Sequence, residues 1–420
     1  MSDNNQTSTD VRDQVRSWLE VNWDPQRSLQ QWREILVDSG WGMPQWPHRW
    51  YGKNLSAADA AIVNEEFAKI GAVGVASGGP GRLAAVTILE HGNDAQKDKY
   101  LRRILTGEDP WCQLFSEPGS GSDLAGATTR ADRKADQSGE RWIVNGQKVW
   151  NTSAHHARYG LLVARTDWDL PKHQGLSYFI IDMTQPGVTV QQLRQMNGYA
   201  SFNEVFMTDA VIEPSDLLGS EGDGWKVAMT TLAHERRMGD ALRNTSSDVD
   251  RSGPIYAEVD AENAVAMEPY RWYPQRAGRV DLLVQQAQAN GTINDPVVRQ
   301  EIARVLVMAR SAEWTSLRAR AAQVRGKPQG PEGSLGKLAA SNIARAASAA
   351  HSLISGAEAM LAGEDGPLDG LIGEILLSVP AISIAGGTDE IQKNIIAERV
   401  LGLDKEPRFD SGPFRDVRRN

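Results

Sequence analysis

One segment, residues 111–126, carries most of the information about the fold. It reads Trp-Cys-Gln-Leu-Phe-Ser-Glu-Pro-Gly-Ser-Gly-Ser-Asp-Leu-Ala-Gly. Small residues, hydroxyls and a Pro-Gly step are typical of a turn. The amides and hydroxyls of such a turn can hydrogen-bond a ring system or a phosphate. Taken alone, the pattern favours an ordinary surface turn at the entry to a β-domain.

The sequence before this segment has the periodicity of helices, and the sequence after it has the pattern of strands. Apolar residues recur at three- and four-residue spacing in Val11–Trp18, Leu29–Leu36, Ala58–Ile70 and Gly81–Glu90. Short β-rich runs separated by turn residues then occur at Trp142–Val144, Leu161–Val163, Tyr178–Ile181, Val188–Val190 and Val205–Met207. No helical pattern lies between these runs, so a parallel Rossmann sheet is not expected.

From Trp225 onward the helical period returns, in residues 225–243, 297–324, 333–362 and 391–401. The sequence therefore predicts an α+β protein that is mostly α. Its parts are a helical N-terminal domain (residues 1–110), a central antiparallel β-domain (111–218) and a C-terminal helix bundle (219–420). Residues 244–275 are polar and interrupted by three prolines, which predicts an inserted loop or short helices.

Composition narrows the class of protein. The 420 residues carry 45 Lys and Arg against 54 Asp and Glu, a formal charge of −9, which disfavours a nucleic-acid binder. Cys112 is the only cysteine, so neither an intrachain disulfide nor a four-cysteine zinc site can form. No apolar run approaches the roughly 20 residues of a membrane helix. The polar segment Met1–Asp10 resembles neither a signal nor a transit peptide, so a cytoplasmic protein is expected.

A second informative segment, residues 145–153, reads Asn-Gly-Gln-Lys-Val-Trp-Asn-Thr-Ser. Its Asn145-Gly146 step between β-like runs predicts a hairpin turn. Strand alternation would then place Trp150 and Thr152 on one face, as an aromatic plate beside a hydroxyl. Taken alone, the pattern favours a tryptophan in the core.

Other short motifs carry little. His234-Glu235 has Met238 where a zinc-protease motif needs a second histidine, so zinc is not expected. The glycines at 78–81 lack the spacing of a dinucleotide fingerprint. No Gly-x-Ser-x-Gly elbow frames a serine nucleophile.

In this order and spacing, the two segments resemble the acyl-CoA dehydrogenase family. The resemblance covers nearly the whole chain and continues through residues 92–97, 202–206 and 386–392. The Ser-Glu-Pro-Gly-x-Gly-Ser-Asp block is specific to the family. The resemblance implies bound FAD, an acyl-CoA substrate, an electron-transfer flavoprotein as acceptor, and a homo- or hetero-oligomer. The family members that this chain resembles are bacterial ones that act on fatty-acyl or steroid-acyl thioesters.

The resemblance also assigns roles to single residues. Gln113, Phe115 and Ser116 match the stretch that contacts the flavin ring, and Ser122 matches a serine near the CoA pantetheine. Further matches to cofactor contacts are Trp150, Thr152, Thr388 and Glu390.

At the family's usual base position this sequence departs from the commonest pattern. Many members carry a glutamate immediately before Gly-Thr, whereas this chain has Gly386, which cannot accept a proton. The reaction needs a base, because an α-hydrogen of the thioester leaves as a proton while the β-hydrogen leaves as hydride. Glu235 is the candidate. It resembles the base of isovaleryl- and long-chain acyl-CoA dehydrogenases, which carry their glutamate on the corresponding helix, before an arginine. A working base there should be buried beside the flavin. Without the family resemblance, Glu235 would be interpreted as a solvated carboxylate on the surface of a helix.

Neighbouring substrate contacts follow from the same resemblance. Arg236 matches the arginine that holds the CoA end of the ligand, and the Gly386 N–H would bind the thioester carbonyl oxygen. The side chain missing at Gly386 leaves space, which predicts a branched or bulky acyl group. Turnover confined to short straight-chain thioesters would contradict that expectation.

Two further departures from the family pattern leave open whether the oligomer contains one kind of chain or two. The arginine motif that clamps the FAD diphosphate of a neighbouring subunit has no clear match between Tyr273 and Gln288, and Ser352–Gly356 replaces the usual Gln-x-x-Gly-Gly. The chain is therefore either an active dehydrogenase using Glu235 or a half-active or non-catalytic subunit of a mixed oligomer. A flavin monooxygenase on the same scaffold is the third alternative, since that class dispenses with the carboxylate base.

Overall fold

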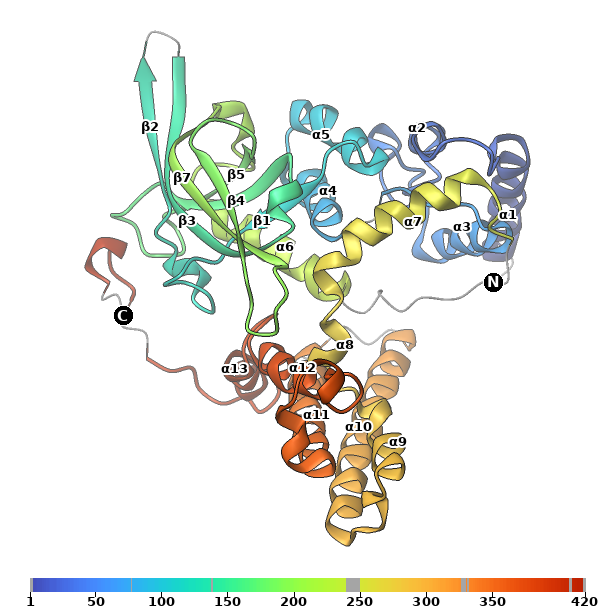
Figure 1. Ribbon diagram of the computed structural model, residues 1–420. Helices are drawn as coiled ribbons and strands as arrows, with labels where there is room; N and C mark the ends of the chain where they lie inside the picture. The colour runs from blue at the N-terminus through green and yellow to red at the C-terminus, as the bar shows by residue number, and fades with distance from the viewer. Residues whose placement is uncertain are drawn as a thin grey trace. The chain divides into compact units, whose positions relative to one another are not determined.

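A computed structural model describes residues 3–76, 78–136, 139–238, 250–325, 330, 332–407 and 410–417. The chain forms two compact units, and Figure 1 shows the elements of each. The first unit comprises residues 1–193, 201–268 and 409–420, and the second comprises 194–200 and 269–408. The predicted fold class is confirmed: helices, a β-domain and further helices follow one another along the chain.

Five helices open the first unit: α1 (Asp3–Asn22), α2 (Leu29–Ser39), α3 (Ala57–Ile70), α4 (Gly79–His91) and α5 (Asp94–Thr106). The sequence sets their ends. Ser28 and Ser56 cap α2 and α3 by accepting backbone N–H bonds, and Asn93 begins α5 with a reciprocal capping box to Gln96. The four helical segments predicted before residue 91 are therefore present as α1–α4.

Seven strands follow: β1 (Trp111–Leu114), β2 (Arg130–Asp136), β3 (Gly139–Thr152), β4 (Tyr159–Arg165), β5 (Leu176–Asp182), β6 (Val188–Leu193) and β7 (Phe202–Ile212). They form one sheet in the order β1-β4-β2-β3-β7-β6, with β5 paired to β4. Most pairs are antiparallel, but β4 runs parallel to both β1 and β2. One face packs on helices through Tyr178, Ile180 and Leu161, and the other forms a second core around Phe179 and Leu162.

The hairpin predicted at Asn145-Gly146 is wrong. These residues lie inside β3, and the antiparallel partners β2 and β3 meet instead at Asp136 and Gly139. A bulge occurs between Val144 and Gly146 opposite β7. Glycine is required there by close approach, because a Cβ on Gly146 would lie 2.7 Å from the Cα of Thr129.

Two helices complete the first unit, α6 (Gly224–Met238) and α7 (Pro254–Met267). The polar stretch predicted as an insertion thus contains a 14-residue helix; residues 239–249 lie outside the described part. Glu258 of α7 accepts the Leu29 N–H at 2.8 Å, and Glu262 pairs with Arg33 at 2.6 Å. These bonds fasten α7 to the start and middle of α2.

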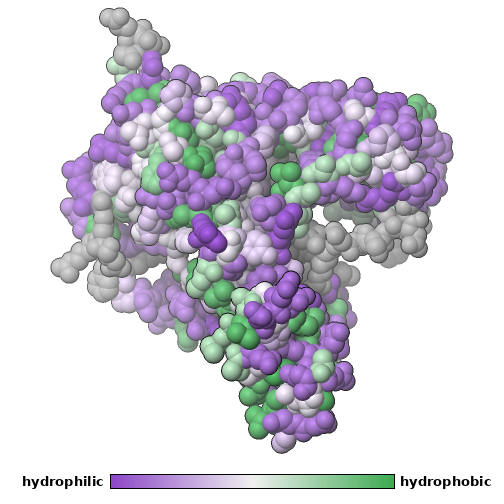
Figure 2. All heavy atoms as spheres, viewed as in Figure 1, coloured by the Kyte–Doolittle hydropathy of each residue, from purple (hydrophilic) through white to green (hydrophobic). Residues whose placement is uncertain are grey.

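The second unit is helical, with α8 (Tyr273–Arg276), α9 (Leu283–Ala289), α10 (Pro296–Val324), α11 (Glu332–Ser355), α12 (Leu371–Ser378) and α13 (Asp389–Arg399). Leu283, Val305 and Ala347 lie in the core shared by α9, α10 and α11. Figure 2 shows hydrophobic side chains exposed between hydrophilic ones over this unit, in the lower part of the view. None of the described helices has the length and hydropathy that crossing a membrane requires.

Candidate active site

A buried ion pair joins the two informative segments. Lys148 is fully buried, and its ammonium donates to Glu117 Oε1 at 2.8 Å and to the Phe115 carbonyl at 3.0 Å. The Glu117 carboxylate also accepts N–H bonds from Thr128 and Thr129, at 2.7 and 2.8 Å. Because both charges are almost completely removed from water, each depends on the other for compensation. Burial raises the pKa of Glu117, but Lys148 and these hydrogen bonds outweigh that effect and lower it to about 2.

Further bonds align the residues next to this pair. The Val149 N–H donates to the Ser116 carbonyl at 2.9 Å, and the Asn151 side chain donates to the Gln113 carbonyl at 2.7 Å. Asn203 of β7 in turn donates to the Asn151 carbonyl at 2.7 Å. The structure therefore brings together the predicted cofactor-contacting residues of the two segments, which are Gln113, Phe115, Ser116, Trp150 and Thr152.

Trp150 is the exposed aromatic of this cluster. Its side chain is 59% exposed, so the interpretation of Trp150 as a core residue is wrong. A second bulge in β3, between Lys148 and Asn151, interrupts the expected alternation, and both Lys148 and Val149 are buried. Trp150 has φ 63°, which is uncommon for a bulky residue and costs conformational energy. The exposed ring meets Phe202 edge-on, and the contact of Trp150 with the flavin stays a prediction.

Helix α6 connects to this cluster through buried hydroxyls. Thr231 Oγ1 lies 3.0 Å from the Tyr178 hydroxyl and 3.0 Å from Thr87 Oγ1 of α4. The Tyr178 ring meets Phe115 edge-on, with centroids 5.8 Å apart. The helix that carries Glu235 is thus joined, through Tyr178, to a predicted flavin-contacting residue.

Glu235 lies one turn after Thr231 and is exposed. The burial expected of a base at Glu235 is therefore not found in the structure. Burial raises the pKa of Tyr178, and the negative charge of Glu235 raises it further. The Arg236 side chain lies outside the described residues. His234 pairs with Glu90 at 2.6 Å, and the described residues contain no cluster of metal ligands.

In the second unit, the predicted residues lie at the start of α13. Thr388 caps this helix by accepting the Ile391 N–H at 3.3 Å, and Glu390 is exposed. Gly386 has φ 68°, a left-handed conformation that favours glycine by itself. A Cβ on Gly386 would meet only Lys337 within 4 Å, so a side chain would find space there. Ser122, the predicted pantetheine contact, is exposed in a loop of the first unit.

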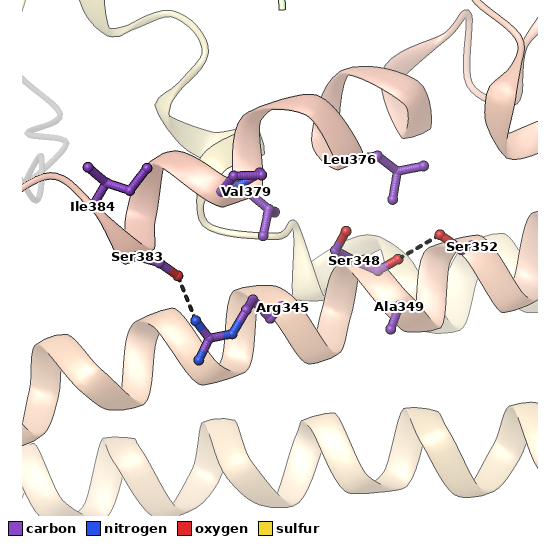
Figure 3. A pocket seen from close by; sticks show the side chains of 9 residues that line it. Arg345, Ser348, Ala349, Ser352, Leu376, Val379, Ser383 and Ile384 are labelled. Carbon is purple, nitrogen blue, oxygen red and sulfur yellow. Dashed lines mark hydrogen bonds between the residues drawn. The ribbon is translucent and has the colours of Figure 1, made fainter. Parts of the chain in front are cut away.

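A hollow of about 500 Å³ lies beside this region of the second unit. Figure 3 shows Arg345, Ser348 and Ser352 of α11 on one side, and Val379, Ser383 and Ile384 on the other. Arg345 donates to Ser383 at 2.7 Å and to buried Asp389 at 2.6 Å, which fixes the first turn of α13. The segment that replaces the usual Gln-x-x-Gly-Gly therefore contributes Ser352 to the lining.

Comparison with known proteins decides the family. Three family models match: "Acyl-CoA dehydrogenase, N-terminal domain" over residues 5–108, "middle domain" over 112–210 and "C-terminal domain" over 279–401. Acyl-CoA dehydrogenase IpdE1 of Mycobacterium tuberculosis is 32% identical over 383 residues, 90% of this chain and 88% of that protein. The chain belongs to the acyl-CoA dehydrogenase family. It is an oxidoreductase, and its cofactor is FAD.

Other relatives agree with this assignment. Acyl-CoA dehydrogenase FadE34 of M. tuberculosis is 36% identical over 379 residues, 88% of this acyl-CoA dehydrogenase but only 46% of FadE34, so the chain spans about half of that relative. The solved structure called "Tcur3481-Tcur3483 steroid ACAD" matches with a TM-score of 0.63 and 21% identity, over 97% of this chain and 99% of that one. The ChsE4-ChsE5 complex from M. tuberculosis matches with a TM-score of 0.62 and 24% identity, over 95% and 98% of the two chains. At these identities the structures show the shared fold.

The residues of this acyl-CoA dehydrogenase fit a flavin. Trp150 presents an exposed ring from a strained backbone beside Ser116 and Thr152. At Gly119 and Gly121, an added Cβ would meet no atom within 4 Å, so nothing in the chain itself excludes a side chain there. Glycine at both positions leaves the loop open to close approach by a ligand.

Sequence reasoning missed the residues that hold the site together. Lys148, Glu117 and Asn151 lie inside the quoted segments, yet none was assigned a role. The available signal was a lysine directly before the apolar pair Val149-Trp150 in a β-rich run, because an inward-facing charge requires a buried partner. Asn203 of β7 gave no comparable signal, since only the pairing of β3 with β7 brings it to Asn151.

Lys148→Met should lower the free energy of unfolding by about 3–5 kcal/mol, because it leaves the buried Glu117 carboxylate without its counter-charge. Urea unfolding followed by circular dichroism measures the change. Arg130→Ala is the control, since it removes an exposed ion pair with Asp132 and should cost less than about 1 kcal/mol. Equal effects of the two substitutions would contradict the role of the buried pair.

Proposed function

We propose that the chain catalyses α,β-dehydrogenation of an acyl-CoA thioester, with Glu235 as the base that removes the α-proton. The observation that carries this proposal is the connection from α6 through Tyr178 to Phe115. It puts Glu235 on a helix that is joined, through Tyr178 of β5, to the segment assigned to the flavin. No carboxylate stands at Gly386 to take this role.

The chain's own residues would divide the work. When bound, FAD supplies the acceptor for a hydride from the β-carbon. Gln113, Phe115 and Ser116, with Trp150 and Thr152, would hold its ring system. Ser122 and Arg236 would bind the CoA part, and the Gly386 N–H would bind the thioester carbonyl oxygen, where negative charge develops as the α-proton leaves.

Glu235 needs a change of surroundings to act efficiently. An exposed carboxylate is a weak base, and removal from water raises its pKa toward the working pH. Flavin and thioester bound beside α6 would supply that desolvation. The Glu235 carboxylate would then take the α-proton; its negative charge already raises the pKa of the buried Tyr178.

Glu235→Gln should reduce turnover by about 10²- to 10⁴-fold, because the amide cannot accept the proton at the rate of a carboxylate. The assay uses a panel of acyl-CoA thioesters with an artificial electron acceptor, and the flavin absorbance reports the FAD content. FAD content should stay at the wild-type level.

Glu90→Gln is the matched control, since Glu90 is a half-exposed carboxylate that pairs with the neighbouring His234. It should leave turnover within about twofold of wild type, as expected of a surface pair. Near-wild-type turnover of Glu235→Gln would exclude Glu235 as the base. No turnover by the wild type alone would favour the half-active subunit of a mixed oligomer.

We propose further that two copies of this chain associate through α10. Val307, Trp314 and Leu317 recur at helical spacing on α10, and Trp314 is 63% exposed. Exposed large apolar side chains on one helix are typical of an interface. The structural neighbours described above include a two-protein complex, ChsE4-ChsE5, so association with a different but related chain is the alternative.

Trp314→Glu should lower the mass of the purified protein in light scattering, because a charge would have to be buried at the contact. Ser316→Glu adds the same charge two residues away, on another side of α10, and should leave the mass unchanged. A wild-type mass of one chain would contradict self-association and favour the mixed oligomer.

A further inference from the structure

The C-terminal segment, residues 410–417, packs on the β-domain of the first unit. The Phe414 N–H donates to the Leu170 carbonyl and the Arg415 N–H to the Trp168 carbonyl, both at 3.0 Å. Phe414 is only 3% exposed, and its ring lies 5.4 Å from that of Trp168. The segment is therefore held by backbone bonds and by one buried aromatic anchor.

The Phe414 ring covers a buried arginine. The guanidinium carbon of Arg165, at the end of β4, lies 3.3 Å from the ring centroid, and Arg165 is fully buried. The same guanidinium donates to the carbonyls of Ala125 at 2.6 Å and Ala127 at 3.0 Å. A desolvated cation is stabilised by an aromatic face, so Phe414 favours the position from which Arg165 binds these carbonyls. Ala125 and Ala127 lie a few residues after Ser122 in the same loop.

A second connection reaches the same loop. Lys172 is mostly buried, and its ammonium contacts Asp123 at 3.1 Å and also pairs with Asp410 of the C-terminal segment. Burial lowers the pKa of Lys172, but its bonds to Asp410 and Asp123 outweigh that effect and raise it. Lys172 thus links Asp410 of the C-terminal segment to Asp123 of the loop.

We propose that Phe414 and Asp410 are positioning residues for acyl-CoA. Acting through Arg165 and Lys172, they hold residues 122–127 in the conformation that binds the CoA part of the substrate. This inference rests on the proposed function, in which Ser122 contacts the pantetheine. Neither Phe414 nor Asp410 touches the ligand.

The expected consequence is a loss of affinity without a loss of cofactor. When the ring is removed, the loop occupies its binding conformation for a smaller fraction of the time. The apparent dissociation constant rises as that fraction falls. The segments at 113–116 and 148–152 have their own anchor in the Lys148–Glu117 pair, so FAD should be retained.

Phe414→Leu tests the proposal, because it keeps an apolar side chain in the buried position and removes the aromatic face. The probe is acetoacetyl-CoA, whose β-carbon has no hydrogen to give up, titrated into the FAD-loaded protein and followed by flavin absorbance. We expect the dissociation constant to rise by about tenfold, with FAD content unchanged. Phe414→Tyr retains the ring and should restore wild-type affinity.

Arg415→Ala is the matched control, since Arg415 lies in the same segment but pairs with exposed Asp169. It should leave the dissociation constant unchanged. Wild-type affinity in Phe414→Leu would overturn the proposal, as would equal loss in Phe414→Leu and Arg415→Ala. If Phe414→Leu loses FAD or unfolds, Asp410→Asn is measured in its place. An unchanged dissociation constant for acetoacetyl-CoA in Asp410→Asn would overturn the proposal. A wild type that does not bind acetoacetyl-CoA would instead contradict the proposed function, whatever the variants do.

Discussion

The Lys148–Glu117 pair is the interaction on which the candidate site depends. A charge buried without compensation is so unfavourable that the two segments carrying these residues must stay together wherever the protein is folded. Because Lys148 also binds the Phe115 carbonyl, the pair fixes the backbone of the residues assigned to the flavin. Glu117 extends the constraint to Thr128 and Thr129, just after the segment 111–126. The bulge that follows Lys148 then leaves Trp150 exposed in a strained conformation.

The proposed position of the base rests on a second constraint. Gly386 has a left-handed backbone, which a residue with a side chain adopts only at a cost. A glutamate at that position would be strained in this conformation, which supports the proposal that the proton acceptor comes from another element. Helix α6 offers Glu235 and is fixed to the β-domain by the hydroxyls of Thr231, Tyr178 and Thr87. An exposed carboxylate on a rigidly placed helix is suited to a base that acts only when ligands cover it.

Periodicity and turn chemistry predicted most of the fold. The helical period and the β-rich runs gave α1–α4 and five of the strands, because both patterns reflect which side chains face a core. The errors lie where a distant contact outweighs a local preference. Asn145-Gly146 has the composition of a hairpin turn, yet Asn145 binds the backbone of Asp209 on the neighbouring strand and stays within β3. Taken alone, the segment 145–153 favours a core position for Trp150, whereas the resemblance predicts a flavin contact; the bulge that leaves the ring exposed cannot be inferred from residue types. The contact between the Phe414 ring and Arg165 joins residues about 250 positions apart and has no local sequence signal.

Hydrogen exchange measured with and without FAD tests most directly whether the two segments joined by the buried pair form the flavin surface. Peptides covering residues 111–118 and 145–153 should become protected together when FAD binds. Exchange in β6, at the edge of the sheet, should not change. If FAD binds, as its absorbance shows, and exchange in both segments is unchanged, the two segments do not form the flavin surface.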